Sequence, residues 1–311
     1  MKKIDMEFLN SKKAYQIIDE INCGKSLLFS LGCYKQFFRS LPLKILALIL
    51  YPIIMFGVKT AEENRRYVIG RKRLVTFLRK IGPFKMRESL PPYYARPLVI
   101  GFNHSSTGDI LRILAIILDR FPAKTIFFPV NLVFYESLSV IAKRLEKISI
   151  YVYPIITPSL FKKMQSERNQ KILASVKLKL ERNHLCQAEL CCRGYGILVV
   201  APSATRKATV FDNRAQSIGE ANDQLLPTMT FLLKRLQKNQ KIVYLAVSLR
   251  PQRINRGLNL FRPYHISVAK EFTTEKALEL DARGKKYFDY AFLKAIAEKL
   301  PFEFWHPPEQ I

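Results

Sequence analysis

Apolar and polar residues alternate in blocks through most of the chain, and the lengths of these blocks predict its architecture. Short apolar runs of about 4 to 8 residues, bounded by turn residues, are typical of strands buried on both faces of a sheet. The predicted strands are residues 98–102, 125–130, 148–153, 195–201, 242–248 and 264–268. The predicted helices are residues 110–118, 133–145, 159–193, 224–237 and, as one or two helices, 274–300. This alternation predicts an α/β fold, with a mostly parallel central sheet flanked by helices on both faces.

A different pattern precedes residue 96, so we divide the chain into an N-terminal helical, membrane-associating region at 1–95 and an α/β domain at 96–311. The most apolar run, residues 45–58, is interrupted by Pro52 and Gly57. It is shorter than the ~20 residues that cross a bilayer. Its flanking lysines and its aromatic residues favour a segment that lies in, or dips into, the membrane interface. A buried helix of the domain and a single tilted span are the alternatives.

The next stretch, residues 62–87, is rich in Lys and Arg, with apolar residues near helical spacing between them. Its cations include Arg65, Arg66, Arg71, Lys72, Arg73, Arg79, Lys80 and Lys85. A basic amphipathic helix beside an apolar anchor is typical of a surface that binds anionic lipid, with each cation contributing about 1 kcal/mol. The alternative is an ordinary solvated helix face.

The formal net charge of +26 indicates a polyanionic partner. Nucleic acid, an anionic membrane leaflet, an acidic protein and a phosphorylated substrate all fit this charge. The chain carries no recognised nucleic-acid-binding motif, whereas its apolar N-terminal region favours the membrane. We therefore expect anionic membrane lipids as partners, and a membrane-associated location on the cytoplasmic face.

The five cysteines are an odd number, which predicts no disulfide framework and indicates a reducing compartment. His184, Cys186, Cys191 and Cys192 lie close together in the sequence, which raises a metal-site hypothesis. Their spacing matches no familiar site, and two adjacent cysteines fit tetrahedral ligation poorly. We expect ordinary thiols here, and no metal.

The functional hypothesis depends on the stretch that follows the first predicted strand. It reads Asn103-His104-Ser105-Ser106-Thr107-Gly108-Asp109. His104 would lie at the carboxyl end of a buried strand, where open α/β sheets bind their ligands. A turn would bring the Asp109 carboxylate back to one imidazole nitrogen, and the other nitrogen would then accept a proton from a hydroxyl. The alternative is a surface turn in which Asp109 only caps the next helix.

A second predicted strand also ends in a tight turn that carries cations. It reads Val199-Val200-Ala201-Pro202-Ser203-Ala204-Thr205-Arg206-Lys207. Together, the two blocks resemble the family of glycerolphosphate and 1-acylglycerol-3-phosphate (lysophosphatidic acid) acyltransferases. The family's first block is Asn-His, four further residues and Asp, and the chain matches it completely. The later block is Phe-Pro-Glu-Gly-Thr-Arg-Ser; Pro202, Thr205 and Arg206 fit it, whereas Ser203 stands in place of the Glu and Ala204 in place of the Gly.

The resemblance implies an enzyme that moves a fatty acyl chain from acyl-CoA or acyl carrier protein to the hydroxyl of lysophosphatidic acid, glycerol 3-phosphate or a related lysophospholipid. His104 would be the general base, oriented by Asp109, and no cofactor beyond the acyl donor is implied. Arg206, with Lys207 behind it, would hold the acceptor phosphate, because a guanidinium fork suits a phosphate monoester. The turn amides around Ser203 and Thr205 would add anion donors. Because Ser203 replaces the family's Glu, the alternative is a catalytically weak or inactive member that binds anionic lipid.

Two further blocks of the family are less clear in this sequence. The family's second block ends in Asp-Arg, whereas residues 148–154 carry no Arg, and Arg144 or Lys147 are the nearby substitutes. Residues 243–247, followed by Pro251, resemble its fourth block. A serine nucleophile is disfavoured because the chain has no Gly-x-Ser-x-Gly elbow. His265 and His306 lie in no motif, so we expect them to be structural or exposed.

Overall fold

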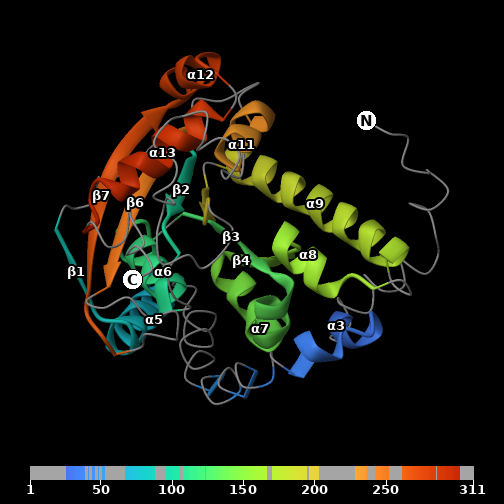
Figure 1. Cartoon of the computed structure of the whole chain (residues 1–311). Helices are drawn as coiled ribbons and strands as arrows, with labels where there is room; N and C mark the ends of the chain where they lie inside the picture. The colour runs from blue at the N-terminus through green and yellow to red at the C-terminus, as the bar shows by residue number, and fades with distance from the viewer. Residues whose placement is uncertain are drawn as a thin grey trace, which may run out of the picture.

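The protein folds around a seven-stranded sheet with helices on both faces, as the computed structural model shows (Figure 1). The structure describes residues 26–38, 41, 44–45, 48, 51–52, 67–87, 96–104, 108–122, 124–166, 170–194, 196–202, 228–236, 242–251, 261–284 and 286–301. Within them, the predicted α/β fold with a mostly parallel sheet is confirmed. Residues 203–227, which include four of the predicted site residues, lie outside the described part.

The strands follow the order β1-β7-β6-β2-β5-β3-β4 across the sheet. Their bounds are β1 Phe84–Met86, β2 Leu98–Phe102, β3 Ile126–Asn131, β4 Ile150–Ile155, β5 Ile197–Val200, β6 Val243–Pro251 and β7 Tyr264–Thr273. In the described part, β6 and β7 pair antiparallel and the other neighbours pair parallel. The carboxyl ends of β2, β5 and β6 therefore share one edge of the sheet, where α/β proteins place their ligand sites.

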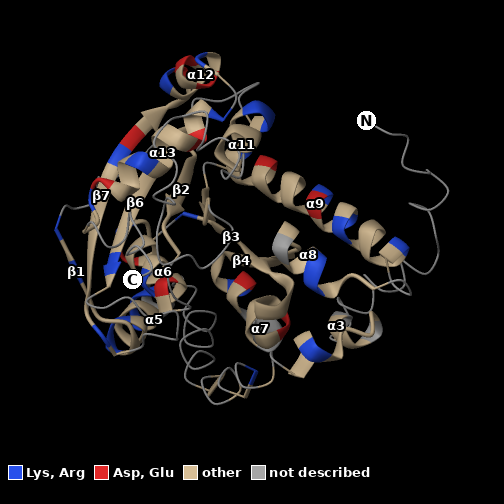
Figure 2. Cartoon of the chain, in the orientation of Figure 1, with Lys and Arg blue, Asp and Glu red and all other residues tan. Residues whose placement is uncertain are grey.

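The helices alternate with the strands, as the sequence predicts. They are α3 Leu27–Ser30, α5 Tyr67–Ile81, α6 Gly108–Arg120, α7 Leu132–Leu145, α8 Pro158–Met164, α9 Gln170–Arg193, α11 Thr228–Leu236, α12 Thr274–Ala282 and α13 Tyr287–Ala297, with a short 3₁₀ turn, η1, at Glu146–Ile148. The predicted 159–193 stretch divides into α8 and α9. Thr157 caps α8, because its side chain accepts a hydrogen bond from the Leu160 N–H and Pro158 follows at the first helical position. Figure 2 shows Lys and Arg distributed over helices of both faces and on the edge strand β1.

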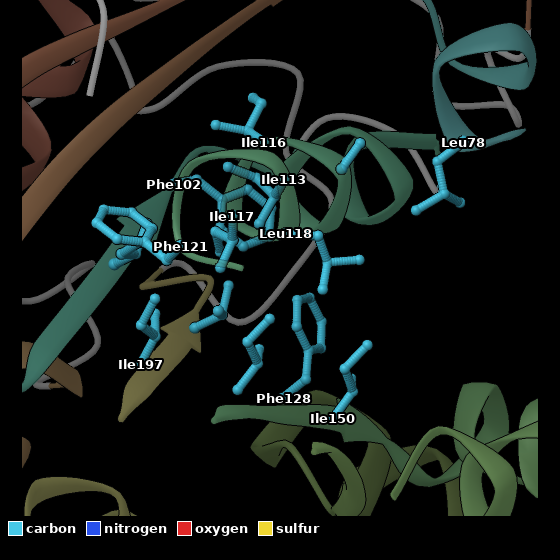
Figure 3. Packing of buried hydrophobic residues seen from close by; sticks show 14 of the residues in the cluster. Leu78, Phe102, Ile113, Ile116, Ile117, Leu118, Phe121, Phe128, Ile150 and Ile197 are labelled. Carbon is cyan, nitrogen blue, oxygen red and sulfur yellow. The ribbon is translucent and has the colours of Figure 1, made fainter. Parts of the chain in front are cut away.

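Two apolar cores separate the helices from the sheet. The helices α5, α6 and α7 pack on one face, where Ile113, Ile116 and Ile117 meet Phe102 and Phe128 of the strands (Figure 3). The helices α9, α11, α12 and α13 pack on the opposite face. Because both faces are covered, every residue of β2 is buried. This burial explains why the strand appears in the sequence as an unbroken apolar run.

The sheet reaches further back along the chain than residue 96, the predicted start of the α/β domain. The strand β1, which the sequence did not reveal, pairs parallel with β7. The helix α5 also packs on the sheet through Leu74, Val75 and Leu78. This part of residues 1–95 therefore belongs to the same folded core as the later strands.

Arg71 on α5 shows that the cations of this stretch do not all face solvent. Its side chain is 2% exposed. The guanidinium donates to the carbonyls of Ile148 at 2.7 and 3.0 Å, of Pro122 at 2.6 Å and of Lys124 at 2.8 Å. Burial lowers the pKa of Arg71 to about 10. Arg71 therefore joins α5 to the chain around η1, and it is not part of a lipid-facing surface.

The apolar segment predicted at 45–58 lies mostly outside the described residues. Among the described residues, no helix combines the length and the apolar composition needed to span a membrane. Several large apolar side chains of this part of the chain are nevertheless more than half exposed: Phe29, Tyr34, Phe38, Ile45 and Leu48. The rings of Phe29 and Tyr34 contact edge to face, with centroids 5.3 Å apart.

Candidate active site

Asn103 fixes the backbone at the point where β2 ends. Its side-chain amide donates to the Leu249 carbonyl at 2.8 Å and accepts from the Leu249 N–H at 2.7 Å. The side chain thus imitates a peptide group and extends the pairing of β2 with β6 by one position. Because one partner is a donor and the other an acceptor, only one orientation of the amide satisfies both. The residue that follows, His104, is therefore held at the carboxyl edge of the sheet.

His104 and Asp109 meet at this edge. The His104 Nδ1 and Asp109 Oδ2 atoms are 3.5 Å apart, which is within ion-pair range but longer than a hydrogen bond. Catalytic contacts are often this long without substrate and shorten when it binds. Asp109 is the second residue of α6 and its side chain is fully buried, so it does not belong to a surface turn. The two can meet because only a few residues separate the end of β2 from the start of α6.

The imidazole is accessible, but not at the nitrogen that faces Asp109. The His104 side chain is 16% exposed. Its Nδ1 atom is buried and makes no hydrogen bond. The exposed area therefore belongs to the rest of the side chain, and Nε2 is the ring nitrogen that does not face Asp109. The Phe102 ring packs edge to face against the imidazole, at a centroid distance of 6.0 Å.

Arg112 lies one turn after Asp109 on α6, and it is fully buried. Its guanidinium donates to the Arg262 carbonyl at 2.7 Å and stacks on the Tyr264 ring, 3.8 Å from the centroid. Burial lowers the pKa of Arg112, and its electrostatic interactions with Tyr264 and Asp109 oppose this shift. Arg112 therefore places a buried positive charge one helical turn from Asp109. Arg112 could not be found from the sequence, because an Arg inside an apolar helix carries no motif.

The second block approaches the first through Pro202. Gly101 of β2 pairs with Val200 of β5, which places the two strand ends side by side. A Cβ atom on Gly101 would lie 2.5 Å from the Phe292 ring of α13 and 3.2 Å from Pro202. Glycine is therefore required here by the close approach of α13. The Thr228 hydroxyl donates to the Pro202 carbonyl at 3.0 Å, so the start of α11 also lies at this edge.

The other predicted site residues divide into two groups. Ser203, Thr205, Arg206 and Lys207 lie outside the described residues, and their roles stay predictions. Lys147, a suggested substitute for the missing second-block Arg, is a misassignment. It lies in η1, which precedes β4. Because β4 belongs to the parallel part of the sheet, η1 lies at the amino edge, opposite His104.

His184 and two of the three cysteines of α9 face the interior of the protein. The His184 Nδ1 and Tyr153 hydroxyl are 2.9 Å apart, and burial lowers the pKa of His184 to about 4. Cys191 and Cys192 are buried, and burial raises the pKa of the Cys192 thiol to about 12. Cys186 is exposed. In the part of the chain that the structure describes, no three His, Cys, Asp or Glu side chains gather as a metal site would require.

A basic hollow of about 380 Å³ lies on α5, lined by Lys72, Arg73, Thr76, Phe77 and Lys80. Neighbouring residues of α5 contact the C-terminal end of α6, since Arg79 pairs with Asp119 at 2.7 Å. His104 lies at the other end of α6. The hollow is therefore separate from the His104–Asp109 pair.

Comparison with known proteins finds structural similarity only at a distance, and the match described below is one of several. No protein-family model matches the sequence, and no curated protein matches it. The fold is similar to the crystal structure of the 1-acyl-sn-glycerophosphate (LPA) acyltransferase PlsC from Thermotoga maritima, with 10% sequence identity and a TM-score of 0.43. The match covers 85% of this chain and 95% of that chain. At this TM-score the similarity carries no argument, and the functional case has to stand on the residues themselves.

Proposed function

We propose that the protein is a membrane-associated glycerolipid acyltransferase. It transfers a fatty acyl chain from acyl-CoA or acyl carrier protein to the hydroxyl of lysophosphatidic acid, glycerol 3-phosphate or a related lysophospholipid. The observation that carries the proposal is the pairing of His104 with the buried Asp109 at the carboxyl edge of the sheet. A sequence resemblance in the same residues gives the reaction class.

In this reaction His104 acts as general base and then as general acid. Its Nε2 takes the proton of the acceptor hydroxyl as the oxygen forms a bond to the thioester carbonyl carbon. The tetrahedral intermediate then collapses, the C–S bond breaks, and the imidazolium returns the proton to the leaving thiolate. No covalent enzyme intermediate is required, since a thioester is already activated. Asp109 stabilises the imidazolium, and its full burial strengthens that interaction.

The acceptor phosphate is held by Arg206, with Lys207, Thr205 and Ser203 around it. Support for this part comes from the described residues that flank these positions in the sequence, Pro202 and Thr228, which are hydrogen-bonded to each other. Both residues lie at the same edge of the sheet as His104. A guanidinium near that edge would place a phosphate within reach of the general base.

Membrane association is supported by the exposed apolar side chains between Phe29 and Leu48. Exposed aromatic and aliphatic groups that gather in one part of a chain are typical of an interface-binding segment. Together with the net charge of +26, they favour an anionic leaflet, and we place the enzyme on its cytoplasmic face.

The test is an acyltransferase assay in detergent and in liposomes, with wild type beside His104→Ala and Asp109→Asn. We expect His104→Ala to lower kcat at least about 100-fold, because a general base contributes ~10² to 10⁴. Asp109→Asn should also lower kcat. The matched control is Asp119→Asn, the same substitution at the exposed far end of α6, which should retain activity. Equal activity in wild type, His104→Ala and Asp109→Asn would refute the mechanism.

The substitution at Ser203 favours a second candidate, a catalytically weak or inactive relative that binds anionic lipid. The same samples distinguish the two. If wild type transfers no acyl chain with either donor, yet floats with anionic liposomes, the lipid-binding function holds and the enzymatic one fails.

A further inference from the structure

Three basic side chains from three neighbouring strands lie in register at one side of the sheet. Lys85 of β1 pairs with His265 of β7, and His265 pairs with Arg250 of β6. Arg87 continues β1, since its N–H donates to the Ile266 carbonyl at 2.9 Å. Two residues after Lys85, it lies on the same face of the sheet. We call Lys85, Arg87, Arg250 and His265 the cationic cluster.

The cationic cluster lies on the face of the sheet opposite α5, α6 and α7. Phe84, Met86 and Leu249 pack against the core under these three helices. Side chains alternate between faces along a strand, so Lys85 and Arg250 point to the other side. Lys85 and Arg87 are exposed, and Arg250 and His265 are half-buried. Figure 2 shows positive charge on β1 at the outer edge of the sheet.

Like charges gathered on one face of neighbouring strands repel each other unless something neutralises them. In the described part of the chain, no acidic side chain forms an ion pair with any member of the cationic cluster. Burial, followed by the charges of Arg87, Arg250 and Lys85, lowers the pKa of His265. Three positive charges therefore act on one imidazole.

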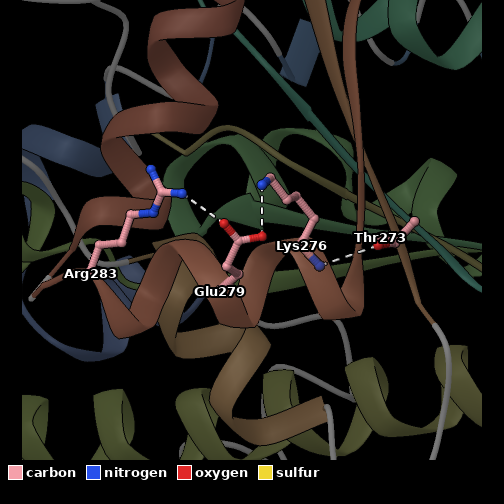
Figure 4. A network of polar contacts seen from close by, with 4 residues as sticks. All are labelled: Thr273, Lys276, Glu279 and Arg283. Carbon is pink, nitrogen blue, oxygen red and sulfur yellow. Dashed lines mark hydrogen bonds and ion pairs between the residues drawn. The ribbon is translucent and has the colours of Figure 1, made fainter.

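The exposed cations of α12 have a counter-charge. On α12, Glu279 bridges Lys276 and Arg283, with both contacts at 2.7 Å (Figure 4). The cationic cluster differs from this arrangement because no acidic side chain of the described residues forms an ion pair with it. A repulsive cluster of this kind is the arrangement expected where an anion binds.

The position of the cationic cluster also connects it to the candidate active site. Arg250 directly follows Leu249, whose backbone bonds to Asn103. The cationic cluster and His104 therefore share the carboxyl edge of the sheet, on opposite faces. Neighbouring strands lie about 4.8 Å apart, so Lys85 and Arg250 are spaced by about 10 Å at the backbone. This span suits two or more phosphate groups better than a single carboxylate.

We infer that Lys85, Arg87, Arg250 and His265 form a binding site for a ligand that carries clustered phosphates. Arginine forks bind phosphate oxygens in pairs, and lysine adds a point charge. Two sources offer this chemistry, the phosphates of coenzyme A in the acyl donor and the headgroups of anionic phospholipids. The site does not depend on His104 as general base, so it stands or falls separately from the proposed reaction.

The test measures binding to the full chain by titration calorimetry and by flotation. The probes are coenzyme A, inorganic pyrophosphate and phosphatidylcholine vesicles with and without phosphatidic acid. We expect Lys85→Gln and Arg250→Gln each to weaken binding about tenfold, as charged hydrogen bonds do. The matched controls are Lys276→Gln and Arg283→Gln, which remove cations of the same kinds from α12. The variant His104→Ala should bind as wild type does.

The outcomes are distinct. Binding of coenzyme A that depends on Lys85 and Arg250 assigns the site to the donor, whereas vesicle binding with the same dependence assigns it to lipid headgroups. Equal binding by the cluster variants and the controls overturns the inference, as does the absence of binding to every probe.

A second readout is thermal unfolding without ligand. Lys85→Gln removes a repulsion, so its Tm should equal or exceed that of wild type, and a lower Tm would contradict the cluster's unneutralised state.

Discussion

Truncation of Asn103 tests whether the end of β2 is held as the structure indicates. In Asn103→Ala, the N–H and carbonyl of Leu249 both lose their partner. Leu249 is fully buried, so water does not readily replace the lost bonds. An unsatisfied buried polar group costs about 1 to 3 kcal/mol, and two such groups give an expected loss of about 2 to 6 kcal/mol of unfolding free energy.

A matched control is available in Asn131→Ala. The Asn131 side chain accepts one hydrogen bond, from the Phe134 N–H at 2.9 Å, at the exposed start of α7. Loss of this cap costs about 1 kcal/mol. Both free energies are measured by urea unfolding followed by circular dichroism. If Asn103→Ala loses no more unfolding free energy than Asn131→Ala, the hydrogen bonds of Asn103 to Leu249 do not hold the end of β2 as proposed.

The same variant separates stability from catalysis. Asn103 touches no reacting atom in the proposed mechanism, and it acts by positioning His104. At a temperature where Asn103→Ala remains folded, kcat should fall while the acceptor KM changes little, because the base is displaced and the acceptor's phosphate contacts are intact. Full kcat in the folded variant would show that the amide stabilises the sheet without positioning the base.

Two further predictions concern buried groups outside the active site. Arg71→Met should lower the unfolding free energy by about 3 kcal/mol or more, because the carbonyls that accept hydrogen bonds from Arg71 lose their donor. Lys72→Met, on the exposed face of the same helix, should change the unfolding free energy by no more than about 0.5 kcal/mol. His184 has a folded-state pKa of about 4, below the ~6.5 of an unfolded chain, so unfolding takes up a proton between these values and stability falls as pH decreases through that window. Between pH 7 and pH 5, His184 alone should lower the unfolding free energy by about 2 kcal/mol. A His184→Gln variant whose urea midpoint falls as much as that of wild type over this range would contradict the assignment.

The strands buried on both faces could be predicted well from the sequence. The bounds 98–102 of β2 match at both ends, because a central strand in a doubly covered sheet is apolar throughout. The antiparallel pair of β6 and β7 was harder to predict. The strand β7 extends to Thr273 and carries Lys270 and Glu271 in its second half, so its apolar run ends before the strand does. The strand β1 has three residues, and only its pairing with β7 defines it.

The roles of individual charged residues could not be predicted from local sequence, because those roles depend on distant contacts. Arg71 and Lys72 are adjacent in a basic stretch, yet one is buried against carbonyls from another part of the chain and the other is exposed. His265 lies in no motif, and its significance comes from Lys85 and Arg250 on neighbouring strands. By contrast, the His104–Asp109 pair was predictable, because both residues belong to one strand–turn–helix unit.

If both proposals hold, the cationic cluster and the His104–Asp109 pair contribute to different kinetic constants. The cationic cluster lies on the face opposite α6, away from His104, so a phosphate bound there gains the same stabilisation before and during acyl transfer. Uniform binding of this kind changes KM and leaves kcat unaltered. Arg250→Gln should therefore raise the KM for acyl-CoA at constant kcat if the cluster holds the donor. If it holds lipid headgroups instead, the same variant should lower the rate on vesicles but not in detergent.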